Sequence, residues 1–401
     1  MRIGIDASRA NLAQRTGTEW YAFHLTKALF AHLHPADEVR LYVREPLRPE
    51  WGSLPQNVQV RILRWPPGIL WTQLRLSWEL IRHRIDVLFV PAHTIPFLAP
   101  KHTVTTLHDI GFEHAEHLYG TTHLGTTGLR SRVLNVIARL VTFGRYGATE
   151  LDYHRFSARR ALHHCEHILT VSEYSKQDIC QTYGVHPDRV HVIPNAIDAT
   201  AFHPNVSNDT ERSAVALNRV GIRPPYIMTI GRVEKKKNTL GLVQAFVRLK
   251  KLPVFAHLQL LLVGKPGVGA EAVDTEIQQS GFAADIFHPG WLPEADVPVL
   301  MANASCFVLP SFFEGFGIPV LEAMAVNTPV VCSAVTSLPE VVGDAAILVD
   351  PHDPRAIANG IASVLSDSAE QAALRARGRA RVQAFSWDRS AAQLAKVLTS
   401  K

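Results

Sequence analysis

The chain has 401 residues, more than one hydrophobic core usually supports, so we expect two domains. Its 47% hydrophobic and 19% charged residues are typical of a soluble globular protein, and no apolar run approaches the roughly 18 residues that a membrane span needs. The net charge of +5 suits an anionic substrate or an anionic membrane surface, and a slight imbalance on a solvated surface explains it equally well.

The four cysteines are scattered without the spacing of a metal site, and we expect reduced core residues in a cytoplasmic protein. They are Cys165, Cys180, Cys306 and Cys332. The first residues lead straight into a strand, so we expect no signal peptide. We expect no nucleic acid partner.

Short apolar strands alternate with helical segments along the sequence, which predicts α/β layers with buried parallel strands. The strands predicted in the first half are Ile3–Asp6, Val87–Val90, Val104–Leu107, Ile168–Val171 and Val190–Ile193. Those predicted in the second half are Tyr226–Ile230, Leu258–Val263, Ile286–His288, Cys306–Leu309 and Val330–Cys332.

The alternation breaks at about Asp198–Pro225, and we place a linker at residues 201–225. Residues 1–200 and 226–384 are predicted as two Rossmann-like, doubly wound domains that face each other across a cleft. Residues 385–401 are predicted as a C-terminal helix that crosses back to the first domain. Ligands of such sheets bind beyond the carboxyl ends of the strands, so the functional loops should follow strands.

His108 stands apart among the 20 histidines because it ends a predicted buried strand on the ligand side. We interpret it as functional, together with the neighbouring Asp109. His163, His164 and His167 precede a strand, and we interpret them as surface residues. We predict no metal site there, since no carboxylate or cysteine geometry supports one.

Residues 121–150 interleave arginines with apolar side chains, which predicts an amphipathic basic helix. The arginines are Arg130, Arg132, Arg139 and Arg145. Such a helix could touch an anionic membrane or a lipid-linked molecule, or pack on its domain with the arginines outward; both readings stay open.

A basic turn, Gly231–Asn238, follows the first predicted strand of the second half. Arg232 offers a planar fork to phosphate oxygens, and Lys237 offers a point charge. Two cations beside a helix N-terminus could neutralise a diphosphate without a metal. A solvated basic turn is the alternative, and the segment described next favours the functional reading.

The segment Glu314–Glu322 follows a later apolar strand and leads into a helix. Gly315 and Gly317 lack a Cβ, so their N–H groups can approach a ligand, and a helix start favours an anion. Glu314 lies on the loop, and we expect Glu322 about two turns into the helix on roughly the same face. This arrangement suits a ligand made of sugar, phosphate and nucleoside better than it suits an ordinary acidic helix start.

Together these segments resemble the retaining family 4 glycosyltransferases of GT-B fold, also grouped as glycosyl transferases group 1. In the second half the resemblance lies in Gly231–Asn238, Glu314–Glu322 and Ser337–Ala346. In the first half it lies in Thr106–Asp109, Val171–Lys176 and Ile193–Asp198, and near the end in Phe385–Trp387. One departure is Ala196, where many members have Gly after the Pro-Asn pair.

The resemblance implies a role for each matching residue. Arg232 and Lys237 would bind the donor diphosphate and stabilise its leaving charge. Glu314 would contact the donor sugar with the backbone of Gly315, Phe316 and Gly317, and Glu322 would bind the ribose hydroxyls. His108 and Asp109 would lie by the transferred sugar, Gly17 would line the phosphate side of the cleft, and Trp291 and Leu292 would lie near the base.

The resemblance also implies a reaction: a retaining, metal-independent transfer of a hexose from a nucleoside-diphosphate sugar to a glycan or lipid-linked acceptor. The domain of residues 1–200 would be the acceptor side. For donor and pathway, the sequence favours mannosyl- or rhamnosyl-type chemistry in surface polysaccharide synthesis. No cofactor is expected, and peripheral contact with the inner face of an anionic membrane stays open.

Other functions remain as alternatives. A GT-B-fold sugar-nucleotide epimerase or glycoside phosphorylase would share the fold. A dinucleotide-dependent dehydrogenase is disfavoured, because the segment after the first strand, Ile5–Ala10, has no glycine where the Gly-x-Gly-x-x-Gly fingerprint should begin. A non-catalytic sugar-binding or scaffold protein is disfavoured by the presence together of five residues: His108, Arg232, Lys237, Glu314 and Glu322.

Overall fold

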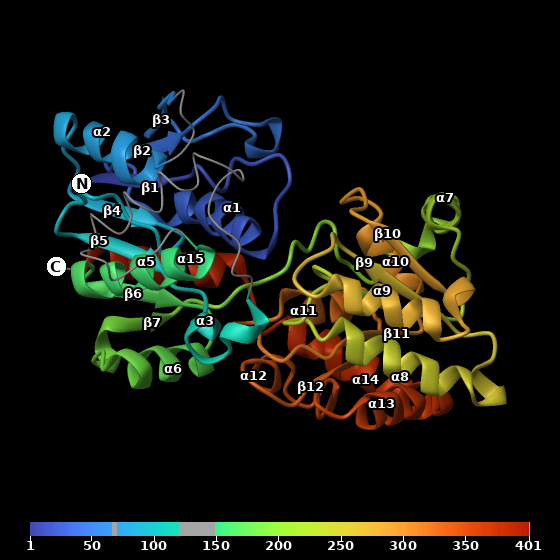
Figure 1. Cartoon of the computed structure of the whole chain (residues 1–401). Helices are drawn as coiled ribbons and strands as arrows, with labels where there is room; N and C mark the ends of the chain where they lie inside the picture. The colour runs from blue at the N-terminus through green and yellow to red at the C-terminus, as the bar shows by residue number, and fades with distance from the viewer. Residues whose placement is uncertain (66–69, 120–148, 401) are drawn as a thin grey trace. The chain divides into compact units, whose positions relative to one another are not determined.

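The computed structural model describes residues 1–65, 70–119 and 149–400, and its chain divides into two compact units. The first unit comprises Met1–Asn195 and Ser386–Lys401, and the second comprises Ala196–Phe385. Each unit holds one parallel sheet with helices around it (Figure 1). The expected α/β class with two Rossmann-like units is therefore confirmed.

The sheet of the first unit has seven strands in the order β3-β2-β1-β4-β5-β6-β7. The strands are β1 (Arg2–Asp6), β2 (Glu38–Val43), β3 (Val58–Ile62), β4 (Val87–Val90), β5 (Thr103–Thr106), β6 (His167–Thr170) and β7 (Val190–Val192). Its longer helices are α1 (Gly17–Leu29), α2 (Ser77–Arg82), α3 (Gly111–His114), α5 (Glu150–His164), α6 (Glu173–Tyr183) and α15 (Trp387–Thr399). A π-helical turn, η3 (Trp71–Leu76), runs directly into α2, and short 3-10 turns lie at Phe30–His32, Pro49–Trp51, Glu116–Leu118 and Pro187–Arg189.

The sheet of the second unit has six strands in the order β10-β9-β8-β11-β12-β13. They are β8 (Tyr226–Ile230), β9 (Gln259–Val263), β10 (Ile286–Gly290), β11 (Cys306–Leu309), β12 (Val330–Ser333) and β13 (Ile347–Val349). The helices are α7 (Thr210–Val220), α8 (Thr239–Lys250), α9 (Ala270–Gln279), α10 (Val297–Asn303), α11 (Ile318–Ala325), α12 (Leu338–Val342), α13 (Pro354–Ser366) and α14 (Ser368–Val382). Short 3-10 turns lie at Val206–Asn208, Pro253–Phe255 and Ala283–Asp285.

Three strands are absent from the sequence prediction: β2, β3 and β13. Strand β2 reads Glu-Val-Arg-Leu-Tyr-Val, so polar residues break its apolar run, and β3 and β13 are the edge strands of their sheets. An edge strand is solvated along one side, so it does not need the continuous apolar run that predicts a central strand. All ten predicted strands are present, within one or two residues of their expected ends.

The segment 201–225, which the sequence presents as a linker, contains helix α7. Asp209 caps this helix by accepting the N–H of Arg212 at 2.9 Å, and α7 packs against α10 of the second unit. The units meet in the chain at Asn195/Ala196 and again at Phe385/Ser386. The polar residues 205–209 that suggested a linker are the turn and N-cap that start a helix.

The last helix, α15, packs on α1 of the first unit. Ser386 caps its N-terminus, and Ala391, Leu394 and Leu398 line its buried face. Ser390 adds a hydrogen bond from its Oγ to the carbonyl of Pro194 at 2.7 Å. The chain therefore returns to complete the first unit after building the second.

Candidate active site

The strand order places a topological switch point between β8 and β11 of the second unit. The chain leaves the sheet toward β9 after β8 and toward β12 after β11, so the loops after these two strands flank a crevice in folds of this kind. The basic turn Gly231–Asn238 follows β8, and Pro310–Gly317 follows β11. Two segments that are far apart in sequence are thus brought to one end of one sheet.

Lys237 and Glu314 form an ion pair across this switch point. The Lys237 Nζ lies 2.7 Å from the Glu314 Oε1, and the Glu314 side chain is nearly buried. The Ser311 hydroxyl donates to the same carboxylate at 2.7 Å. With partners from two loops, the carboxylate is held in one orientation, as a preorganised binding group requires.

The backbone of Glu314 is held as firmly as its side chain. Its N–H donates to the Thr336 Oγ1 at 3.2 Å, and the Ser337 hydroxyl donates to its carbonyl at 2.9 Å. Thr336 adopts a left-handed φ of 56°, an uncommon conformation for a β-branched residue. The sequence analysis did not identify Thr336, because no local sequence pattern predicts a threonine with a left-handed backbone conformation.

Arg232 is exposed on the same turn as Lys237, and the turn is fixed to the loop that follows β9. The N–H of Val233 donates to the Lys265 carbonyl at 3.0 Å, and the N–H of Lys235 donates to the Val268 carbonyl at 2.8 Å. A Cβ on Gly264 would lie 1.8 Å from the Gly231 carbonyl oxygen, so only glycine permits this approach. The guanidinium is therefore available to a ligand from a rigid support.

Helix α11 begins at Ile318 with Gly317 as its N-cap. Gly317 has a φ of 92°, and a Cβ there would meet the Leu338 Cδ2 at 2.5 Å, so glycine is required by conformation and by packing. The side chain of Phe316 is buried edge-to-face against Phe385, which leaves only the backbone of Gly315–Gly317 to meet a ligand.

The expected position of Glu322, about two turns into the helix, is wrong. Because α11 starts at Ile318, Glu322 is its fifth residue, just over one turn in. Burial of its carboxyl group, with a smaller effect from the Asp198 carboxylate, raises the pKa of Glu322 to about 8. Without a ligand the group is therefore mainly protonated at neutral pH, and it can donate as well as accept a hydrogen bond.

Trp291 and Leu292 follow strand β10, as expected. Leu292 is buried, whereas the Trp291 ring is 38% exposed with the Lys265 Nζ 5.4 Å from its centroid. An exposed indole offers an apolar face to a planar base, whereas Leu292 acts through packing. The sequence analysis gave both residues the same role, but in the structure only Trp291 has a side chain exposed enough to contact a base.

In the first unit, His108 follows β5 and packs edge-to-face on Tyr21 with ring centroids 4.7 Å apart. Its Nε2 lies 3.4 Å from the Pro91 carbonyl oxygen, which can only accept, so Nε2 carries the proton and Nδ1 keeps its lone pair. Burial lowers the pKa of His108 to about 4. At neutral pH it is an uncharged hydrogen-bond acceptor.

The remaining site residues of the first unit lie at element starts. The Asp109 carboxylate accepts the N–H of Gly111 at 3.1 Å. Gly17 is the first residue of α1, where the Glu19 carboxylate accepts the N–H of Thr16 at 3.1 Å in a capping box. Arg9 reaches the same carboxylate at 3.3 Å.

Sequence reasoning missed a polar cluster beside the switch point of the first sheet, between β1 and β4. His93, on the loop after β4, lies 2.9 Å from the His154 Nδ1 of α5. The Thr94 hydroxyl lies 2.9 Å from the Tyr153 hydroxyl, which also accepts from the Gln73 amide at 3.2 Å. One sequence feature could have indicated this cluster, because the polar segment Pro91–Thr94 directly follows the predicted strand Val87–Val90.

Neither a metal cluster nor a membrane span was found in the part of the chain that the structure describes. Within residues 1–65, 70–119 and 149–400, no three His, Cys, Asp or Glu side chains are grouped so that they could hold a metal ion. None of the helices in these ranges has the length and apolar character that crossing a bilayer requires. The amphipathic helix expected at residues 121–150 lies almost wholly outside the described residues.

Two family models match the sequence at these units. The Glycosyltransferase Family 4 model matches residues 15–201, and the model for Glycosyl transferases group 1 matches residues 218–381. Between them they match most of the chain, with the candidate site residues of the first unit in one and those of the second in the other. The chain belongs to the family 4 glycosyltransferases.

Individual relatives are similar over part of the chain. O-antigen chain mannosyltransferase B of Escherichia coli is 35% identical over 60% of this chain and 62% of that protein. The MMP alpha-(1->4)-mannosyltransferase of Mycolicibacterium hassiacum is 32% identical over 63% of this chain and 57% of that protein. The matches thus span about three-fifths of the length of these relatives.

Solved structures share the fold over nearly the whole chain. Sucrose-phosphate synthase of Thermosynechococcus elongatus has a TM-score of 0.70 at 20% identity and covers 98% of this chain and 97% of its own. Anabaena HepE, solved with UDP and glucose, has a TM-score of 0.71 at 18% identity and covers 100% and 99%. These likenesses identify the GT-B class of fold.

Proposed function

We propose that this protein is a retaining, metal-independent glycosyltransferase. It moves a hexosyl group, mannose or a related sugar, from a nucleoside-diphosphate donor to a glycan or lipid-linked acceptor in surface polysaccharide synthesis. The observation that carries the proposal is the Lys237–Glu314 pair at the switch point of the second sheet, with Arg232 exposed on the same turn.

The two cations fit the diphosphate of the donor. Arg232 supplies planar paired donors, and Lys237 supplies a compact charge paired with Glu314, on the loop that leads into α11. In the free protein Lys237 is neutralised by Glu314, so a bound phosphate oxygen shares a cation that is already positioned. Glu314, once it shares Lys237, accepts hydrogen bonds from sugar hydroxyls.

The chemistry we propose is attack from the face that the leaving group vacates. The bond between the anomeric carbon and the diphosphate oxygen breaks, the acceptor hydroxyl oxygen bonds to that carbon, and its proton passes to the departing phosphate. Arg232, Lys237 and the amides of Gly315–Gly317 stabilise the charge on the diphosphate. Anomeric configuration is thereby retained without a protein nucleophile.

His108 and Glu322 complete the assignment as uncharged groups. The Nδ1 of His108 accepts a hydrogen bond from a hydroxyl of the transferred sugar. Glu322 bonds to the ribose, and Trp291 stacks on the base. Asp109 acts beside His108, and Gly17 offers the N-terminal end of α1 to the phosphates.

Support for the donor class comes from relatives. The matching mannosyltransferases are named for mannose transfer, and the structure of HepE holds UDP and glucose. The base and sugar are best identified by thermal shift against a panel of nucleoside diphosphates, followed by assay of the matching radiolabelled nucleotide sugars with and without acceptor lipid extract. An epimerase would convert the sugar without acceptor, and this outcome would contradict the proposal.

A second assay tests metal independence and stereochemistry. Transfer in excess EDTA should proceed at the rate seen with Mn²⁺ or Mg²⁺, because the diphosphate charge is met by Arg232 and Lys237. NMR of the product should show the anomeric configuration of the donor. Loss of activity in EDTA with recovery in Mn²⁺, or an inverted product, would refute the respective claim.

A further inference from the structure

One face of the helical segment Trp71–Arg82 carries an exposed apolar stripe. It consists of Leu74, Trp78 and Ile81, which are 43%, 51% and 55% exposed. Their spacing of four and three residues puts them on one side of a helix. Three large apolar side chains aligned in this way form a surface patch that calls for an explanation, unlike a single exposed leucine. We call these three residues the α2 stripe.

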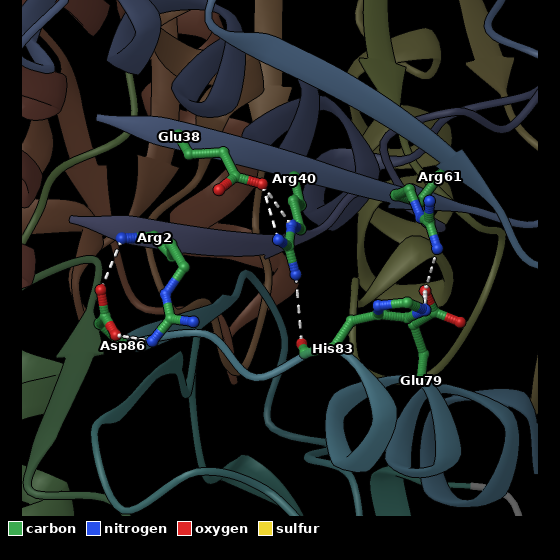
Figure 2. Close-up of polar contacts among 7 residues, drawn as sticks. All are labelled: Arg2, Glu38, Arg40, Arg61, Glu79, His83 and Asp86. Atoms are coloured by element: carbon green, nitrogen blue, oxygen red, sulfur yellow. Dashed lines mark hydrogen bonds and ion pairs between the residues drawn. The ribbon is translucent and has the colours of Figure 1, made fainter. Parts of the chain in front are cut away.

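The opposite face of the same segment is firmly anchored. Trp71, Leu76 and Leu80 are buried in the core of the first unit. Glu79 is also buried and accepts from Arg61 of β3 at 2.8 Å and from Arg75 at 3.2 Å. Figure 2 shows Arg61 of β3 bonded to Glu79 of α2, and Arg40 of β2 bonded to the backbone carbonyl of His83, directly after α2. The exposure of the α2 stripe therefore belongs to a well-packed helix.

Cations surround the α2 stripe. The guanidinium carbons of Arg82 and Arg75 lie 4.6 Å and 5.5 Å from the centroid of the Trp78 ring. Arg64 and Arg84 are exposed near the two ends of the segment. Between residues 70 and 85 the one acidic residue is Glu79, which is buried and paired. The exposed face is thus apolar at its centre and positive at its border.

We propose that the α2 stripe and its arginines dock the protein on an anionic lipid bilayer. Tryptophan, leucine and isoleucine insert at the level of the headgroups, and the arginines bind lipid phosphates while their stems cover apolar surface. A second copy of this chain fits less well, because a two-fold contact would set arginines against arginines. The inference rests on the proposed function in one respect: a membrane-bound enzyme can reach a lipid-linked acceptor.

The test is vesicle co-sedimentation with the full chain. Wild type should bind vesicles that contain phosphatidylglycerol, bind vesicles of pure phosphatidylcholine weakly, and lose affinity as salt rises. The double substitution Trp78→Glu with Ile81→Glu should lower the partition coefficient at least roughly tenfold, because it removes inserted side chains and adds repulsive charge. Arg82→Gln should lower it about fivefold, the equivalent of one phosphate-binding arginine.

Matched controls separate this surface from general effects. Val254→Glu changes an exposed apolar side chain of the second unit, and Arg248→Gln removes an exposed cation of α8. Both should leave the partition coefficient within twofold of wild type. Nucleoside diphosphate binding, measured by calorimetry, should be the same in all variants, so a failure of the proposed donor chemistry is seen separately from a failure of docking.

Three results would overturn the inference. Wild type could fail to bind anionic vesicles, or the Trp78→Glu and Ile81→Glu double variant could bind them as tightly as wild type does. In the third, gel filtration would show a dimer that the double variant dissociates while vesicle binding is unchanged, which would assign the α2 stripe to a second copy of the chain. Circular dichroism and thermal unfolding confirm that the variants are folded.

Discussion

The two units share a sheet architecture but carry different side chains at the switch points of their sheets. In both parallel sheets the strand order reverses beside the first strand, between β1 and β4 in the first unit and between β8 and β11 in the second. In the second unit the switch point carries an ion pair, Lys237–Glu314, and an exposed arginine. In the first unit it carries hydroxyl and imidazole groups, among them Tyr153, His93 and His154.

The difference matches two kinds of ligand chemistry. A diphosphate is best met by fixed cations and helix N-termini, because charge-assisted hydrogen bonds are the stronger ones. A sugar hydroxyl is best met by uncharged groups that donate and accept. Burial lowers the pKa of His93 well below its usual value and lowers that of His108, which keeps both imidazoles uncharged at neutral pH. The first unit is therefore suited to hydroxyls and the second to a charged donor.

The largest effect should come from removing the cations of the second unit. Arg232→Ala or Lys237→Ala should lower turnover at least roughly 100-fold, because each takes away a preorganised donor to the leaving diphosphate. Both residues are at least partly exposed, so the fold should survive. Steady-state kinetics with the identified nucleotide sugar measures the effect.

Two exposed cations of the same unit serve as controls for this prediction. Arg248→Ala and Lys251→Ala remove charge of the same sign from α8 and its C-terminal end, away from the turn that follows β8. They should turn over within about twofold of wild type. Near wild-type rates in both Arg232→Ala and Lys237→Ala would contradict the proposed difference between the two units, because turnover would then not depend on the cations of the second unit.

The two glutamates of the second unit should respond differently. Glu322→Gln should weaken nucleoside diphosphate roughly tenfold by altering bonds to the ribose. Glu314→Gln should leave that affinity unchanged or raise it, because Lys237 loses its neutralising partner, while turnover falls roughly tenfold or more. Calorimetry with the nucleoside diphosphate and kinetics with the nucleotide sugar measure the two effects. Equal weakening of the nucleoside diphosphate by both variants would show that the positional assignment is wrong.

Stability should depend on pH in opposite directions in the two units. The pKa of Glu322 is raised to about 8, so the native state holds a proton that the unfolded chain loses, and the free energy of unfolding falls as pH rises from about 4.5 to 8. The pKa of His108 is lowered to about 4, so unfolding free energy is lost as pH falls from about 6.5 to 4.

Two substitutions should each remove one of these slopes. Glu322→Gln should gain roughly 3 kcal/mol over wild type at pH 8 relative to pH 5, and His108→Gln should lose less stability than wild type between pH 6.5 and 4. Calorimetric unfolding across this pH range, analysed as two transitions because the chain has two units, tests both. Parallel pH profiles for wild type and Glu322→Gln would contradict the buried, protonated carboxyl group.

The smallest effect should come from the hydroxyl cluster of the first unit. Tyr153→Phe removes one uncharged hydrogen-bonding group beside Thr94 and Gln73, which is worth about 1 kcal/mol. If this cluster meets the acceptor, KM for the acceptor should rise about fivefold with kcat and donor affinity unchanged. Tyr183→Phe, which removes a hydroxyl bonded to Glu113 on the same unit, is the matched control and should change neither constant. If Tyr153→Phe changed the donor affinity instead, the first unit's switch point would have to be assigned to the donor and not to the acceptor.

Much of the second unit could be predicted from the sequence, because its determinants are local. Buried central strands such as Cys306–Leu309 are continuous apolar runs, and Arg232 and Lys237 lie in one turn directly after such a strand. The strand-to-helix transition between Glu314 and Glu322 was also evident from local sequence, although the helix itself begins only at Ile318. Local spacing also identified His108 as the end of a strand.

What only the tertiary structure decided is what depends on distant segments. The Lys237–Glu314 pair joins residues 77 apart in sequence, and the His93–His154 contact joins residues 61 apart. Strands β2, β3 and β13 gain their stability from neighbouring strands more than from their own patterns, so they escaped prediction. Helix α7 was missed for another reason, because its polar N-terminal turn was interpreted as a linker. The pKa values of Glu322 and His108 are likewise set by burial, because desolvation depends on every segment packed around the group and on no single stretch of sequence.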